Sequence, residues 1–410
     1  MNRAVLFGKR GLVCLCRLAT MVFLMSVLLM GLWSHSTYAE EVRGVTDHTI
    51  KFGIIGDMTG PAVATWFPMI EGVRNHFRHV NDQGGIHGRK VKVIAEDSRI
   101  SIARALAAFK KLAYRDRVIA FWGPGSTSEI FALFSQIEKE KMPDMSPSPS
   151  EGLLKPFKRY VFLLAALYDE QVGVMMDYIK NDLEAKDPRI AVVYTDNESG
   201  KTVLRSVRKY TKLYGLNLVS EQVLNFGAVD ATSQVLNLKR AKADYIIQLA
   251  IIQVAACLLR DARKYSLDAT FFATMYGCDE DTVKLAGKAS KKFIGAHCFS
   301  PWYEESPGVV KMRDVSLKYQ PGKTHNRYYT QGWVAAMLFT DAMKRAGKDL
   351  TSEKLVDRLE EIKDFDTKGL CGPITFTSKN HKALDSVKLY KADVEKALLI
   401  PVTGWRRPSR

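Results

Sequence analysis

A short segment rich in glycine and hydroxyl side chains follows an apolar run in the first third of the chain. It reads Gly123-Pro-Gly-Ser-Thr-Ser-Glu129 and lies between the β-type run 118–122 and an amphipathic stretch. Glycine lets the backbone approach a bound molecule, and a helix that starts at Ser126–Ser128 presents free N–H groups and the positive end of its dipole. Ser126 or Thr127 would also serve as a simple helix cap. The pattern favours the binding of a carboxylate.

The chain lacks the patterns of nucleotide binding and of catalysis. No Lys-Ser/Thr follows a G-x-x-x-x-G, and none of the eight histidines stands in a metalloprotease or hydrolase motif. His76 and His79 lie three residues apart on a predicted helix, where we interpret them as surface residues. We therefore expect a binding protein rather than an enzyme, with no cofactor and no metal.

The elements that must position this segment alternate between strand and helix. Strands are predicted at 50–55, 91–96, 118–122, 160–166, 190–195, 218–224, 245–250 and 270–275, and helices between them at 68–82, 100–115, 128–141, 170–183, 200–214, 233–241, 253–265 and 281–285. The tail adds helices at 330–346 and 352–362 and short strands near 374–376, 387–390 and 399–402. The prolines of Met145-Ser-Pro-Ser-Pro-Ser150 predict a rigid loop. This alternation predicts α/β lobes with parallel sheets, in which ligands bind beyond the carboxyl ends of the strands.

The first 39 residues have the pattern of an export signal. Four basic residues precede an apolar run at 18–33, which is short for a membrane span, and Thr37-Tyr-Ala39 supplies small residues before a cut. We expect cleavage after Ala39 and a periplasmic location, an uncleaved anchor being the alternative.

The net charge of +16 comes from scattered lysines and arginines, so we expect a basic surface and no nucleic-acid binding. Cys257 is expected to be a buried thiol, and whether Cys278, Cys298 and Cys371 form a disulfide is left open.

Three strings resemble one protein family. They are Ile54-Ile-Gly-Asp-Met-Thr-Gly-Pro61, Glu71-Gly-Val73 and Asn81-Asp-Gln-Gly-Gly-Ile-His-Gly-Arg89 with Asp97 after it. They are similar to the periplasmic branched-chain amino acid (Leu/Ile/Val) binding proteins of ABC importers, and the likeness covers essentially the whole mature chain. It implies the type I periplasmic-binding-protein fold, with two doubly wound parallel-sheet lobes joined by three hinge crossovers. We expect a signal peptide at 1–39, a first lobe at 48–166 and 298–376, and a second lobe at 167–297 and 385–403.

The resemblance also implies which residues hold the ligand. The family grips the ligand's α-carboxylate and amine from the first lobe, at positions that here are Thr127, Ser148 and Ser150, with Ser126 beside them. It places an acidic residue after the strand 270–275 to balance the amine, where this chain has Tyr276, although Asp279 is near. A tyrosine of the family's second lobe aligns with Ser199. The second-lobe side of the pocket therefore departs from the family pattern.

Aromatic residues are expected to supply the apolar walls of this pocket. Trp66 lies in a loop where the family places a ring, and Tyr168 follows the first crossover; packing in the protein interior is the alternative for Tyr168 and for Phe67. We expect a monomer that captures an amino acid or another small carboxylate and delivers it to an ABC permease of the inner membrane. A sensory binding protein of the same fold is the alternative function.

Overall fold

The computed structural model of the chain describes Met21 and residues 42–409. The predicted signal and its cleavage site lie outside the described residues. All that follows concerns the compact unit that begins at Arg43.

The first sheet is parallel and contains five strands in the order β2-β1-β3-β4-β5. Its strands are β1 (Thr49–Gly56), β2 (Lys90–Asp97), β3 (Ala120–Trp122), β4 (Asp144–Ser146) and β5 (Val161–Leu163). Side chains of β1 alternate between two buried faces. Phe52 packs on Phe77 and Phe339, whereas a side chain at Gly53 would meet Leu112 and Phe121 on the other face. Burial on both faces explains the apolar composition of these strands.

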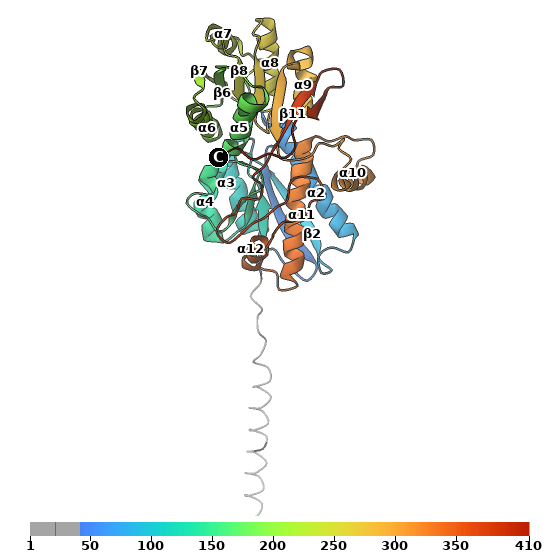
Figure 1. The fold of residues 1–410 in the computed structure, drawn as a ribbon. Coiled ribbons are helices and arrows are strands. Elements are labelled where there is room, and N and C mark those ends of the chain that lie inside the picture. Colours follow the sequence, from blue (N-terminus) through green and yellow to red (C-terminus); the bar gives the residue numbers. More distant parts are fainter. Residues whose placement is uncertain (1–20, 22–41, 410) are drawn as a thin grey trace, which may run out of the picture. The chain divides into compact units, whose positions relative to one another are not determined.

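Helices cover both faces of this sheet. They are α2 (Val63–Asp82), α3 (Ile102–Lys110), the π-helix η1 (Lys111–Asp116), α4 (Thr127–Glu140), the short 3-10 helix η2 (Glu151–Leu153), α10 (Pro307–Tyr319), α11 (Arg327–Ala346) and α12 (Ser352–Glu360). Figure 1 shows α11, in orange, running beside α2, in blue. The two helices pack closely because Gly72 and Gly332 lie at their contact, where a Cβ at Gly332 would stand 1.9 Å from the Met69 carbonyl oxygen.

The second sheet contains seven strands in the order β12-β11-β10-β9-β8-β6-β7. They are β6 (Arg189–Tyr194), β7 (Asn217–Val223), β8 (Tyr245–Gln248), β9 (Thr270–Ala273), β10 (Phe293–His297), β11 (Lys388–Asp393) and β12 (Leu398–Pro401). Strands β6 to β10 are parallel, and β11 and β12 form an antiparallel hairpin at the β10 edge. The accompanying helices are α5 (Tyr168–Asp177), η3 (Tyr178–Asp182), α6 (Glu198–Tyr214), α7 (Thr232–Arg240), α8 (Ile252–Lys264), α9 (Glu280–Ala286) and η4 (Gly287–Ser290).

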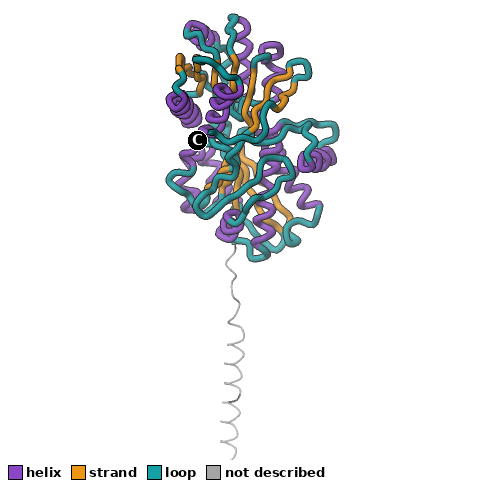
Figure 2. Tube along the Cα trace, in the orientation of Figure 1, coloured by secondary structure: helices purple, strands orange, loops and turns teal. Residues whose placement is uncertain are grey.

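The chain passes between the two sheets three times. It leaves the first sheet after β5, returns to the helices of that sheet after β10, and enters the second sheet again at β11. Figure 2 shows loop segments, in teal, running between the two groups of strands. The expected α/β fold with two lobes and three crossovers is confirmed. The residue boundaries that we give to the lobes stay a prediction.

The helix α2 differs from the sequence prediction because it begins at Val63, before Pro68 rather than at it. A proline inside a helix leaves the carbonyl four residues earlier without its N–H partner. That carbonyl belongs to Ala64, and it accepts a hydrogen bond from Asn326 Nδ2 at 3.2 Å. A residue distant in sequence thus compensates for the proline. The interpretation of His76 as a surface residue is wrong, since α11 covers this face of α2 and leaves His76 8 % exposed.

Three further predictions need correction. The segment 145–150, which the sequence predicts to be a loop throughout, begins inside the buried strand β4. The charged residue Asp144 made this strand hard to recognise in the sequence. The strand expected near 374–376 is absent from the described strands, and Ile374 makes only an isolated bridge with Phe365. The sequence prediction also omitted β10 and α10. Among the described residues, no helix combines the length and apolar character that crossing a membrane requires.

Candidate ligand site

The predicted hydroxyl segment lines a small cavity between the two sheets. The cavity measures about 30 Å³ and lies where the carboxyl ends of strands from both sheets meet. Figure 1 shows α4 and α6, whose N-terminal ends contribute to it, on facing sides of this junction. Its lining consists of Ala62, Thr65, Trp66, Ile100, Gly125, Ser126, Thr127, Ser148, Tyr168, Ser199, Phe226, Ile251 and Tyr276.

Glycine is required where the chain leaves β3 for this cavity. Gly123 has φ +117, and a Cβ there would lie 1.9 Å from the Ile55 carbonyl oxygen, so only glycine fits. At Gly125 a Cβ would approach Ile100 at 2.8 Å and a Glu129 carboxyl oxygen at 3.3 Å. The backbone therefore passes tightly between β1 and the start of α4. This passage fixes the position of the helix N-terminus.

Three hydroxyl groups from three elements meet at the cavity. Thr127, the first residue of α4, places Oγ1 2.5 Å from Ser148 Oγ in the loop after β4. The same Thr127 oxygen lies 2.7 Å from Ser199 Oγ in the first turn of α6, so this contact joins the two lobes. Ser126 caps α4 by accepting a hydrogen bond from the Glu129 N–H at 3.3 Å. The capping interpretation thus holds for Ser126, while Thr127 points its hydroxyl at the other lobe.

Aromatic rings form the remaining walls. The Tyr276 hydroxyl donates a hydrogen bond to the Pro147 carbonyl oxygen at 2.6 Å, which is a second contact between the lobes. The Trp66 ring stacks on Tyr276 with ring centroids 6.5 Å apart, and Tyr328 stacks behind Tyr276 at 6.0 Å. Tyr168 is 2 % exposed and lines the cavity too. Phe67, in contrast, is 38 % exposed and does not line it.

No charged side chain is part of the lining. Glu129 stands directly behind Gly125, and burial raises the pKa of its carboxyl group, which favours the neutral acid. Burial also raises the pKa of the Tyr276 hydroxyl well above its ordinary value, so this group stays protonated and donates. The site can therefore offer hydroxyl groups and helix N–H groups to an anion. It offers no carboxylate to a cation.

Two residues of the predicted site lie outside the cavity. Ser150 is buried and places its hydroxyl 3.4 Å from Thr202 Oγ1 of α6, which is a further contact between the lobes. Asp279 is fully buried and caps α9 by accepting a hydrogen bond from the Asp281 N–H at 3.0 Å. Its Oδ1 is used at this helix end, while Oδ2 is buried without a hydrogen-bond partner among the described residues, and burial raises the pKa of the carboxyl group well above its ordinary value. The structure brings together Ser126, Thr127, Ser148, Trp66, Tyr168 and Tyr276.

The sequence prediction missed part of the second-lobe wall. Phe226 follows β7, Ile251 follows β8, and Ser199 follows β6, each just beyond the carboxyl end of its strand. The rule that ligands bind at these ends could have selected all three. Ser199 was noticed only as a departure from the family pattern.

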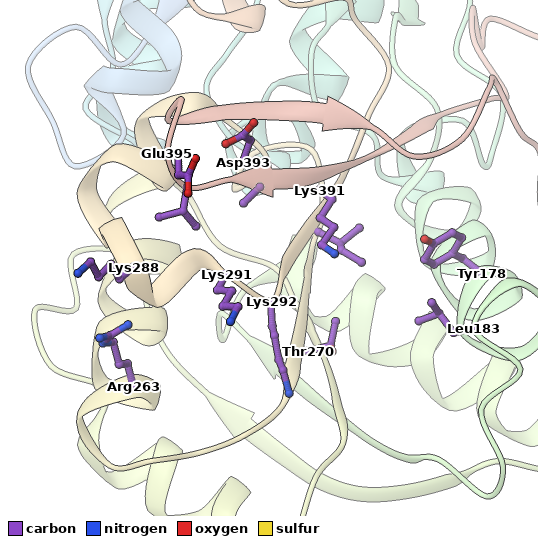
Figure 3. A pocket seen from close by; sticks show the side chains of 13 residues that line it. Tyr178, Leu183, Arg263, Thr270, Lys288, Lys291, Lys292, Lys391, Asp393 and Glu395 are labelled. Carbon is purple, nitrogen blue, oxygen red and sulfur yellow. The ribbon is translucent and has the colours of Figure 1, made fainter.

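A much larger cavity, of about 890 Å³, lies at the amino ends of β9 and β10, whereas the small cavity lies at carboxyl ends of strands. Figure 3 shows Lys288, Lys291, Lys292 and Lys391 around it, with Asp393 and Glu395 on the β11–β12 hairpin. It is an open surface hollow lined by solvated lysines, and Lys292 is paired with Asp268 at 2.5 Å. Size alone would select this hollow, but the converging hydroxyl groups are in the small cavity between the lobes.

A buried ion pair lies close to the small cavity. Arg327, at the start of α11, is completely buried and donates to Glu280 of α9, so it joins a helix of the first sheet to a helix of the second. The Tyr303 hydroxyl lies 2.9 Å from the same carboxylate and 2.6 Å from the Leu399 carbonyl oxygen, and the guanidinium stacks over the Tyr390 ring at 4.3 Å. Arg327 is the direct neighbour of Tyr328, which stacks on Tyr276. We call Arg327, Glu280, Tyr303 and Tyr390 the hinge brace.

Comparison with known proteins agrees with this architecture. The family described as periplasmic binding protein matches residues 49–397. The leucine-specific-binding protein of Salmonella typhimurium is 23% identical over 339 residues, which cover 82% of this chain and 89% of that protein.

Solved structures show the same fold. The structure of a branched chain amino acid ABC transporter from Thermus thermophilus with bound valine has a TM-score of 0.82 at 23% identity and covers 88% of this chain and 97% of that one. The fatty acid ABC transporter substrate-binding protein from Thermomonospora curvata has a TM-score of 0.81 at 23% identity and covers 90% of this chain and 94% of that one. The family match, over most of the chain, confirms the expectation of a binding role in place of catalysis. The chain belongs to the periplasmic binding protein family, within the group related to the Leu/Ile/Val-binding proteins.

Proposed function

We propose that this protein is the extracytoplasmic solute-binding component of an ABC importer and that it captures a small carboxylate by lobe closure. The observation that carries the proposal is the cluster of Thr127, Ser148 and Ser199 at the N-terminus of α4, in a lining without charge. A helix N-terminus with free N–H groups and nearby hydroxyls stabilises an anion. The family membership supports the binding role.

The contacts across the lobes suggest how binding is coupled to closure. Thr127 and Ser199 belong to different lobes and share a hydrogen bond of 2.7 Å. A carboxylate that accepts from both hydroxyls keeps the lobes connected while it satisfies its own oxygens. The ligand favours the closed form by the free energy of the contacts that it makes with both lobes together.

The chemistry of the lining selects among ligands. An amino acid carries an ammonium group, and burying it without a carboxylate partner costs free energy. One related structure contains bound valine and another is named for fatty acid transport, so the names on this fold include a carboxylate with an ammonium group and one without. Because Tyr276 stands where the family places an acidic residue, we propose a carboxylate with an apolar body and no free ammonium group; an amino-acid-like solute is the second candidate.

The size of the cavity adds a condition. A volume of about 30 Å³ is enough for about one or two water molecules, and far too small for a leucine-sized body. Binding must therefore move side chains. Trp66 and Tyr276 are stacked rings in the lining, so we expect the contact between the Tyr276 hydroxyl and the Pro147 carbonyl to open when a ligand enters.

A matched set of ligands tests this assignment. Isocaproate has the carbon skeleton of leucine without the ammonium group, and isoamylamine lacks the carboxylate. Calorimetry should show isocaproate binding more tightly than leucine, and no binding of isoamylamine. Strong binding of leucine or valine with none of isocaproate would overturn the ligand class.

Substitutions test the position of the site. Thr127→Val with Ser148→Ala should weaken carboxylate binding by about tenfold or more, because two hydroxyl donors are lost. Ser128→Ala, one residue along α4 and outside the lining, is the matched control and should bind as before. Undiminished affinity in the double variant would show that the site lies elsewhere.

Coupling to import and location need experiments in cells. N-terminal sequencing of the protein from the periplasm should begin near Glu40 if the expected signal is removed. Uptake of the labelled carboxylate should depend on this protein together with an ABC permease. Uptake that is unchanged without the protein, together with a ligand-dependent change in gene expression, would favour the sensory alternative.

A further inference from the structure

Another cavity, partly open to solvent, lies on the first-sheet side of the molecule, away from the site between the lobes. It measures about 450 Å³ and is bounded by α2, α10, α11 and the loop around residues 367–370. It shares no lining residue with the cavity at Thr127. Its volume falls within the range of about 300–1,000 Å³ that small-molecule sites have.

The floor of this cavity is apolar. Val80, Trp333 and Leu370 are nearly fully buried there, and Met337 is half-buried. The Trp333 ring meets the His76 ring edge-on, with centroids 4.9 Å apart. A flat indole beside a flexible methionine side chain fits a planar or branched apolar group.

One buried polar group in this floor has an unused hydrogen-bonding atom. His76 Nε2 lies 3.1 Å from Thr340 Oγ1, and Nδ1 is buried with no hydrogen-bond partner among the described residues. Burial lowers the pKa of His76 to about 3, with His79, Lys344 and Lys311 acting in the same direction, so the ring is neutral. When the Thr340 hydroxyl donates to Nε2, the proton of the ring is on Nδ1. The ring then offers a donor that the protein itself leaves unpaired.

The rim of the cavity is cationic. Lys311 of α10 and Lys344 of α11 are exposed lining residues, and neither has a carboxylate within ion-pair distance in the described part of the chain. Lys368, also at the rim, is already paired with Asp366 at 2.6 Å. The lining contains no aspartate or glutamate. The charge of the rim is thus complementary to an anion.

We propose that this cavity binds a small amphipathic carboxylate, with its apolar body against Trp333 and Met337 and its carboxylate at Lys311 and Lys344. His76 lines the same cavity at its buried end. The ammonium groups attract the anion, and the burial of its apolar body supplies the larger part of the affinity. This site is separate from the cavity between the lobes.

The test uses 4-phenylbutyrate as the probe and the Thr127→Val/Ser148→Ala protein as the background, in which binding of a carboxylate at the cavity between the lobes is weakened. Calorimetry should show one saturable site. The neutral 4-phenylbutanol and the cationic 4-phenylbutylamine should bind at least about tenfold more weakly, since they lack the charge that the rim attracts. Equal binding of the amine would overturn the proposal.

Lysine variants separate this rim from the general basic surface. Lys311→Met with Lys344→Met should weaken binding of 4-phenylbutyrate by about tenfold. Lys110→Met with Lys139→Met removes two exposed lysines of α3 and α4 and should have no effect. Unchanged affinity in the first pair, or the same loss in both pairs, would contradict the site.

The indole N–H resonances report where the probe binds. In the ¹⁵N-labelled protein the resonance of Trp333, assigned through Trp333→Phe, should move during titration with 4-phenylbutyrate. The resonance of Trp66, at the cavity between the lobes, should not move. Movement of Trp66 alone, or no saturation at millimolar concentrations, would exclude this cavity as the binding place. Failure here leaves the assignment of the cavity between the lobes untouched, because that cavity is tested with isocaproate, leucine and isoamylamine in the natural protein.

Discussion

The two lobes are joined by two kinds of buried polar contact, neutral hydroxyl groups at the cavity and a charged pair at the hinge brace beside it. At the cavity, Thr127, Ser199 and Tyr276 join the lobes through neutral hydroxyl groups. At the brace, Arg327 and Glu280 join them through a fully buried ion pair. Losing one partner of a buried ion pair leaves an unpaired charge, which lowers stability strongly. A hydroxyl group that changes from one hydrogen-bond partner to another changes the free energy little. We therefore expect the hinge brace to hold the junction between the lobes and the hydroxyl contacts at the cavity to be the ones that a ligand replaces.

The largest effect is expected at the brace. Arg327→Met should lower the free energy of unfolding by about 3–5 kcal/mol, because it leaves the Glu280 carboxylate buried without its partner. Urea unfolding at neutral pH measures this. Arg313→Met, which breaks the pair with the exposed Glu305 and a hydrogen bond to the Trp302 carbonyl oxygen, should cost less, about 1–2 kcal/mol.

Adding Glu280→Gln to Arg327→Met should recover part of the loss, since the unpaired charge is then removed as well. No recovery would mean that packing of Arg327 against Tyr390, rather than its charge, supports the junction. The comparison between a charged brace and a neutral cavity would then lose its energetic basis.

A charge placed in the cavity should change the ligand. Tyr276→Asp supplies the acidic group that the lining lacks and removes a bulky ring. We expect the affinity for leucine relative to isocaproate to rise by about ten- to a hundredfold, which calorimetry measures. Tyr276→Asn opens the same space without the charge and should not produce this change. An equal shift in both variants would show that volume, not charge, determines the preference.

A smaller effect is expected when only the hydroxyl group is removed. Tyr276→Phe loses the hydrogen bond to the Pro147 carbonyl, which should shift the equilibrium between open and closed lobes by about 1 kcal/mol towards the open form. Small-angle X-ray scattering without ligand should show a larger radius of gyration. Tyr114→Phe, whose hydroxyl contacts Glu140 within the first lobe, is the control. An unchanged radius would mean that this contact does not hold the lobes together.

The smallest effect concerns Glu129, behind the cavity. Its pKa in the folded protein is raised above 4.5 by burial, so the folded state holds a proton that the unfolded state releases. Stability should therefore decrease as pH rises from 4.5 through the folded pKa. Glu129→Gln removes this dependence and should be more favourable, relative to the natural protein, at pH 8 than at pH 4 in urea unfolding. Exposed Glu184→Gln should show no such trend, and an identical trend for both would contradict the assignment.

The predicted elements were most accurate where the pattern is local. The strand β1, the helix α4 and the loop at Gly123 were placed within a residue or two, because apolar periodicity and glycine depend only on neighbouring residues. The prediction failed where a residue distant in sequence determines where a helix begins or whether a side chain is buried. Asn326 makes it possible for α2 to pass through Pro68, and α11 buries His76, yet neither partner is near in sequence. The walls at Phe226 and Ile251 were missed because nothing local marks them.

The sequence by itself determined the α/β class, the two-lobed family and the position of the hydroxyl-rich helix start. These follow from periodicity, from glycine and from short strings, all of which can be read along the chain. Only the tertiary structure decided that Tyr276 reaches across to Pro147, that Asp279 caps α9, and that no charged side chain lines the cavity between the lobes. The polarity of a pocket depends on which side chains meet there. Side chains from separate strands meet only when both sheets are folded and joined, so the sequence alone does not determine that polarity.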